Sequence, residues 1–209
     1  MKKRLAVLGA VAALAAACDP PLDVAPGVQM QDLQGTWYEI AHLPRPTQQG
    51  CSNTTATYTP IDKTTMGVSH VCLLPTGDHL TSTAALYATD PSAQGRMKID
   101  LGGFFGDYDV ITMAADKSWF VVGHPSRQYL WVLSRDKHMA QADLDSALTY
   151  AKQDGFDTTK VEYTNQDGTG SIQPSAGGCD ASGAPARGAT GLGVLVAGAL
   201  ALAARRRKG

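Results

Sequence analysis

The stretch "GTWYEIAHLPRP", residues 35–46, carries a strand pattern that ends at a loop broken by two prolines. Successive side chains of a strand point to opposite faces, so Trp37, Glu39 and Ala41 share one face and the residues between them share the other. A carboxylate in line with a tryptophan is unusual on a purely apolar inner face. We therefore expect Trp37 and Glu39 to face an interior that combines apolar surface with polar groups.

Strand-like composition recurs seven more times after this stretch. Turn-like segments such as "LPTGD" (74–78) and "AADKS" (114–118) separate the runs. The eight runs are residues 36–43, 54–61, 66–74, 79–88, 96–101, 107–115, 118–124 and 129–135. Eight strands joined by short connections predict an all-β fold, an eight-stranded antiparallel up-and-down barrel, with a sandwich as the alternative.

One amphipathic helix follows the strands. An apolar stripe at helical spacing runs through residues 141–154, at Leu144, Ala147, Leu148 and Ala151. Gly155 is placed to end this helix, and a ninth strand is predicted over 160–165. We expect the single C-terminal α-helix to pack on the outside of the barrel, which spans residues 31–170.

The N-terminal segment has the pattern of an export signal. Residues 1–17 combine a basic start with a short apolar run, too short to cross a bilayer. "LAAAC", ending at Cys18, resembles a bacterial lipoprotein box, which implies lipidation of Cys18; an ordinary signal peptide with an incidental cysteine is the alternative. Residues 18–30 are rich in Pro, Asp and Gly without periodicity, which predicts a lipidated tether.

The C-terminal segment contains a second candidate anchor. Residues 171–187 form a Gly-, Ala- and Ser-rich linker with Cys179, and residues 188–209 join an apolar run to an Arg-rich end. This order resembles a myxosortase-type sorting tail, which implies cleavage of the tail with Cys179 holding the anchor. A plain transmembrane anchor is the alternative. Both ends predict an exported, membrane-anchored protein of a bacterial cell envelope, at the outer membrane or cell surface.

Charge separates the body of the chain from its ends. The whole chain has a net charge of −1, whereas residues 19–178 hold ten Lys and Arg against eighteen Asp and Glu, a net charge of −8. Nucleic-acid binding depends on basic surfaces. An acidic body therefore excludes nucleic acid as a partner.

Cys51 and Cys72 are predicted to form a disulfide. Directly opposed residues of a hairpin have a constant index sum, and for this pair it centres the turn between Ile61 and Asp62, within a turn-like segment. An exported protein permits oxidation. A metal site or a catalytic thiol is the competing hypothesis.

The chain resembles the lipocalin family, in particular bacterial outer-membrane lipocalins and their apolipoprotein D relatives. "GTWYEIAHLP" is similar to the family's N-terminal signature, and "YLWVLSR" (129–135) to the signature on its last barrel strand. In the middle signature Asp116 fits, but Ala115 and Lys117 replace the usual Thr and Tyr. The resemblance covers about residues 30–168.

The resemblance implies roles for individual residues. Trp37 plugs the closed end of the barrel, and Arg135 lies across it. By strand parity the residues expected to line a ligand cup are Glu39, Ala41, Tyr129, Trp131 and Leu133. The alternative for Glu39 is a structural pairing with Arg135 or a hydrogen bond to a tyrosine.

The predicted function is a membrane-anchored carrier of a fatty acid, a lysophospholipid or a similar small hydrophobic ligand. We expect no cofactor, no metal and no catalytic activity. A homodimer is a possible assembly. The alternatives are a self-filled barrel that acts through its surface, with exposed aromatics at 104–108, and a lipid-modifying enzyme. Scattered histidines and the lack of a nucleophile motif disfavour the enzyme.

Overall fold

The computed structural model describes residues 20–168 and 171–172. The predicted signal peptide, Cys18, Cys179 and the apolar tail at 188–209 lie outside the described residues. All of the described residues belong to one compact unit, which ends at Pro174.

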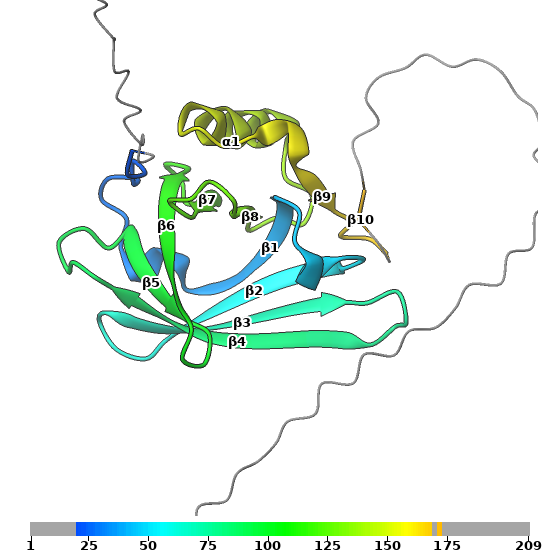
Figure 1. Cartoon of the computed structure of the whole chain (residues 1–209), viewed down its shortest axis with the longest axis horizontal. Helices are drawn as coiled ribbons and strands as arrows, with labels where there is room; N and C mark the ends of the chain where they lie inside the picture. The colour runs from blue at the N-terminus through cyan, green and yellow to red at the C-terminus, as the bar shows by residue number, and fades with distance from the viewer. Residues whose placement is uncertain (1–19, 169–170, 173–209) are drawn as a thin grey trace, which may run out of the picture. The chain divides into compact units, whose positions relative to one another are not determined.

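Eight antiparallel strands form a closed barrel (Figure 1). They are β1 (Gly35–His42), β2 (Ser52–Pro60), β3 (Thr65–Leu73), β4 (His79–Ala88), β5 (Arg96–Asp100), β6 (Phe105–Met113), β7 (Trp119–Gly123) and β8 (Leu130–Ser134). Each strand pairs with the next, and β1 pairs with β8 to close the ring. The predicted up-and-down barrel is confirmed, because two separate sheets would leave β1 and β8 unpaired.

Further elements lie around the barrel. Two short strands, β9 (Glu162–Thr164) and β10 (Ser171–Ile172), extend the sheet from β1. Three 3₁₀ turns, η1 (Met30–Leu33), η2 (Pro46–Gln48) and η3 (Thr158–Lys160), lie outside the ladder.

The helix α1 (Gln141–Gln153) packs outside the barrel against β6 and β7, as predicted (Figure 1). It buries Leu144, Ala147 and Ala151, and Gly155, with φ +89°, follows its end. No helix among the described residues is long and apolar enough to cross a membrane.

The barrel wall separates two hydrophobic cores. The inner core fills the lower half of the barrel with large side chains, including Trp37, Tyr58, Leu86, Met97 and Phe120. The outer core lies between the wall and α1, with Ile40, Val121, Val132 and Phe156 among its members. The described members of both cores all lie in the unit that ends at Pro174, so we expect a chain from Pro20 to Pro174 to fold by itself.

The segment expected to be a tether instead packs against the barrel. Leu22, Val28 and Met30 are buried, the Ala25 amide donates to the Val110 carbonyl at 2.8 Å, and the Arg96 guanidinium donates to the Leu22 carbonyl at 2.7 Å. We call residues 20–29 the strap. Its packing could not be predicted from hydrophobic periodicity, because its apolar residues pack singly along an extended chain without the repeat of a helix or strand.

The disulfide between Cys51 and Cys72 is confirmed, with a Cα–Cα distance of 5.4 Å. The predicted register is wrong, however. Tyr58 pairs with Val68, which shifts the turn towards Lys63, and the register is irregular between Ser52 and Thr55. Cys51 precedes β2, so the disulfide fastens the loop before β2 to β3 rather than joining two opposed ladder residues.

Candidate functional site: the mouth of the barrel

The closed end is plugged by Trp37. Its indole Nε1 donates to the Leu33 carbonyl at 2.7 Å, and its ring meets Phe120 edge-on at 4.6 Å. The Arg135 guanidinium carbon lies 3.5 Å from the Trp37 ring centroid, within the range of a cation–π contact. The N–H groups of Arg135 donate to three backbone carbonyls, those of Asp32, Gln34 and Thr36.

A polar contact lies within the inner core above the plug. The hydroxyls of Tyr58 and Tyr108 hydrogen-bond to each other, and both side chains are buried. Burial is the main cause that raises the pKa of each phenol, so both stay protonated at neutral pH. The pair satisfies two hydroxyls without a ligand, and this level of the barrel is filled by the protein.

A β-bulge in β1 redirects the first strand near the mouth. The pairing of β1 with β8 shifts between Glu39, opposite Leu133, and Ala41, opposite Val132. Ala41 consequently belongs to the outer core, and the prediction that it lines the cup is wrong. His42, which parity placed outside, lies opposite Trp131 and is buried. The extra residue of a bulge reverses the alternation, and nothing in the local sequence announces it.

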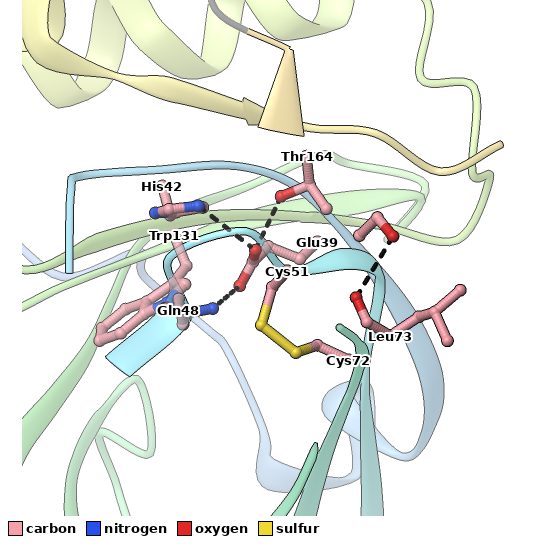
Figure 2. Close-up of a disulfide and its surroundings, with 9 residues drawn as sticks. Glu39, His42, Gln48, Cys51, Cys72, Leu73, Trp131 and Thr164 are labelled. Atoms are coloured by element: carbon pink, nitrogen blue, oxygen red, sulfur yellow. Dashed lines mark hydrogen bonds and ion pairs between the residues drawn. A yellow bond between two sulfur atoms is a disulfide. The ribbon is translucent and has the colours of Figure 1, made fainter. Parts of the chain in front are cut away.

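Glu39 is buried at the inner face with 1% exposure, and its hydrogen bonds are made within the protein. Figure 2 shows Thr164 donating to Oε1 at 2.7 Å and Gln48 donating to Oε2 at 2.8 Å. The His42 Nε2 lies 3.8 Å from Oε1. The partners differ from the arginine or tyrosine of the structural alternative. They show that Glu39 fastens η2 and β9 to β1.

Above this level the barrel opens into a cup. Inward positions of β4 go from fully buried at Leu86, through half-buried at Ala84, to 44% exposed at Leu80. Inward positions at the start of β8 and just before it follow the same order, from buried Leu133 through half-buried Trp131 to Tyr129, 39% exposed. Because the inward residues of both walls become exposed toward the same end, we infer that this end of the barrel is an open cup that solvent can reach.

The loop between β1 and β2 forms part of the rim. The Gln48 side chain joins Glu39 to Trp131, whose Nε1 lies 3.4 Å from Gln48 Oε1 (Figure 2). The Arg45 guanidinium lies over the rings of Trp131 and Tyr129, with centroid distances of 4.9 and 5.4 Å. Sequence analysis missed Arg45 and Gln48 because a loop without periodicity gives no sign of which side chains turn inward.

His70 also faces the cup, since it pairs with inward-facing Ala56. Burial is the largest cause that lowers the pKa of His70. The neighbouring Glu39 raises this pKa, and Arg45 lowers it further. His70 is therefore uncharged at neutral pH. Arg45 provides a fixed positive charge in this region.

A second hollow lies outside the barrel. It has a volume of about 600 Å³ and lies between the strap, the end of β6 and the end of α1. Its lining includes three carboxylates, Asp23, Asp32 and Asp154, and Lys117 is paired with Asp32 at 2.6 Å. Such a charged, open surface suits an apolar ligand less well than the cup does.

Comparison with known proteins agrees with this architecture. A family model described as Lipocalin-like domain matches residues 28–166. The outer membrane lipoprotein Blc of Citrobacter freundii is 30% identical over 173 residues, covering 78% of this chain and 98% of that protein. Blc of Escherichia coli K12 is 31% identical over 137 residues, covering 65% and 77%.

A solved structure supports the same fold. Insecticyanin from the tobacco hornworm Manduca sexta aligns with a TM-score of 0.56 at 19% identity, covering 70% of this chain and 85% of that one. The barrel closed through β1 and β8, the plug at Trp37 and the match across residues 28–166 lead to one conclusion: the chain belongs to the lipocalin family.

Proposed function

We propose that this protein is an outer-membrane lipoprotein of the lipocalin family that binds one amphipathic lipid, a fatty acid or a lysophospholipid, in its cup. The relatives named outer membrane lipoprotein support the location, and the family match supports a small hydrophobic ligand. The acyl chain enters first, toward the inner core, and the head group stays at the polar rim.

The observation that carries this proposal is the graded exposure of the inward-facing wall. Leu80, Ala84 and Trp131 give the cup apolar walls, and the buried inner core, which begins at Leu133, lies below them. A cup of this kind accepts an acyl chain of limited length and leaves the head group near water. Trp131, Leu133 and Tyr129 are the proposed ligand contacts. Glu39 supports them indirectly, because its hydrogen bond from Gln48 holds the loop at the rim.

Native mass spectrometry tests the proposal. The Pro20–Pro174 unit, exported to a periplasm and purified without detergent, should carry a bound species with the mass of a fatty acid or lysophospholipid. Ser82→Trp should displace it, because Ser82 faces inward at an exposed position and pairs with inward-facing His70.

Thr83→Trp is the matched control, since Thr83 is the next residue of β4, also exposed but outward-facing. A folded barrel that stays empty and takes up no added fatty acid would contradict the carrier proposal and leave the fold intact. In that case the exposed aromatics Phe104 and Phe105, 79% and 70% accessible, favour a surface interaction instead.

We propose further that Cys18 is the lipidated residue and that Cys179 serves a sorting tail. The intact mass of the membrane-extracted protein tests both. A chain that begins at Cys18 with attached acyl groups is expected, and Cys18→Ala should abolish those groups. A chain that ends near Cys179 supports the sorting tail, and one that retains residues 188–209 contradicts it.

A further inference from the structure

Arg45 differs from the other arginines of the described chain in what its guanidinium touches. Within residues 20–168 there are four arginines, and three of them donate to backbone carbonyls: Arg96 to Leu22, Arg127 to Pro125 and Asp154, and Arg135 to three carbonyls at the plug. No side-chain hydrogen bond or ion pair from Arg45 to any of the described residues is present. Its five N–H donors remain available.

The Arg45 guanidinium lies beside inward-facing aromatic residues at the mouth. The guanidinium lies over Trp131 and Tyr129, whose rings are nearly parallel, with 10° between their planes. This aromatic shelf holds the cation at the rim above the apolar walls. Half-burial of the side chain withdraws water from the guanidinium, and burial is the leading cause that lowers the pKa of Arg45, which stays charged.

The backbone around Arg45 is held in place. Arg45 lies between Pro44 and Pro46 and has an extended conformation, φ −138° and ψ 129°. The Gln48 amide donates to the Arg45 carbonyl at 3.1 Å, and the Cys51 amide donates to the Gln48 carbonyl at 3.0 Å. The disulfide then fixes Cys51 to β3, so the loop presents Arg45 without a large ordering cost on binding.

The nearby carboxylate does not neutralise this cation. Glu39 influences Arg45 electrostatically, but no oxygen of Glu39 lies within 4.0 Å of the guanidinium, and both oxygens are engaged by Thr164 and Gln48. A desolvated cation with free donors favours an anion that can accept two parallel hydrogen bonds.

We infer that Arg45 is the head-group site of the cup and selects lipids whose head group is anionic, a carboxylate or a phosphate. This inference rests on the proposed function and adds to it a rule of specificity: a neutral lipid of the same chain length fills the same walls but offers the guanidinium no anionic acceptor. The acyl chain then runs from the rim at Trp131 toward Leu133.

Isothermal titration of the Pro20–Pro174 unit with four ligands of one tail tests the inference. The ligands are decanoate, monodecyl phosphate, 1-decanol and decyltrimethylammonium, at pH 7.5. The wild type should bind the two anions at least about 10-fold more tightly than decanol, as expected for charge-assisted hydrogen bonds. Arg45→Gln should weaken both anions about 10- to 100-fold and change decanol by less than about threefold.

Two further variants separate recognition from folding. Arg45→Lys retains the charge but not the planar fork, so it should recover part of the anion affinity, and more of it for the phosphate than for the carboxylate if the charge outweighs the fork. Lys63→Gln makes the same charge change at an exposed residue of the β2–β3 hairpin, at the closed end, and should leave all four affinities unchanged.

The outcomes distinguish the two proposals. Wild type that binds no ligand of the series overturns the proposed carrier function and this inference together. Anions and decanol that bind alike in wild type and Arg45→Gln overturn the inference alone. An equal loss of affinity for all four ligands in Arg45→Gln also overturns the inference, because such a loss would mean that Arg45 maintains the shape of the rim and does not recognise the head group.

Discussion

Truncating Leu22 to alanine tests whether the strap belongs to the barrel or tethers it. Leu22 is buried against the outer core, where its side chain lies near Phe156 and the Gly123 position. Leu→Ala changes at buried sites cost about 2–5 kcal/mol, depending on how far the surroundings collapse. The strap is a single extended segment at the edge of the core and can shift, so we expect the lower half of that range, about 2–3 kcal/mol.

Urea and thermal unfolding of the Pro20–Pro174 unit measure the effect. For a domain of this length each 1 kcal/mol lowers the Tm by about 2–4 °C, so Leu22→Ala should melt roughly 5–10 °C below wild type. Leu101→Ala deletes the same atoms at a 51% exposed position and should change stability by less than about 0.5 kcal/mol. If both variants unfold with the wild-type midpoint, residues 20–29 are a tether and the packing argument is refuted.

Three more perturbations test the disulfide, a close packing contact and the buried carboxyl group of Asp109 in β6. Replacing Cys51 and Cys72 by alanine should lower the free energy of unfolding by about 3 kcal/mol, from the loop set by their separation of 21 residues, and a reductant should reproduce that loss in wild type alone. Gly123→Ala places a Cβ 2.6 Å from the Phe156 ring and should cost about 1–3 kcal/mol in urea unfolding; an equal cost in a Phe156→Leu background would argue against the clash. Burial raises the pKa of Asp109 to about 6, so its contribution to stability is complete below about pH 4 and is lost as the pH rises through 6. At pH 8 the free energy of unfolding of Asp109→Asn should therefore exceed that of wild type by about 1 kcal/mol, and the difference should vanish at pH 4. A gain in stability that does not depend on pH would show that another cause is responsible.

Two exposed aromatic residues lie at the mouth of the barrel. Phe104 and Phe105 follow Gly102 and Gly103, both with positive φ; Phe104 ends the connection between β5 and β6, and Phe105 begins β6. A loop of this backbone places two aromatic rings in water near the cup entrance. The possible homodimer and a contact with a membrane surface both remain predictions for this loop.

Much of the fold is determined locally, and sequence alone therefore predicted it. Alternation over five to ten residues defines each strand, and turn residues separate the strands. The stripe through Leu144 and Ala151 defines α1, since helical periodicity depends on neighbours four residues apart. The disulfide was predicted for a similar reason, because a hairpin brings Cys51 and Cys72 together within 21 residues.

The site depends on features that are not local. The bulge after Glu39 moved Ala41 outward and His42 inward, although parity from Trp37 predicted the opposite. A bulge is stabilised by the partner strand, here β8, ninety residues later in the chain, so the sequence around it carries no mark of it. One extra residue was enough to exchange which side chains face the cup.

The sequence by itself determined the order of strands, the single outer helix and the residues of the plug. The tertiary structure decided the rest: that the strap packs on the barrel, that Glu39 accepts hydrogen bonds from Gln48 and Thr164, and that the Arg45 guanidinium lies over Trp131 without a hydrogen bond to another described side chain. Local preferences act between neighbours in sequence, whereas burial and hydrogen-bond partners come from segments that meet only when the barrel closes.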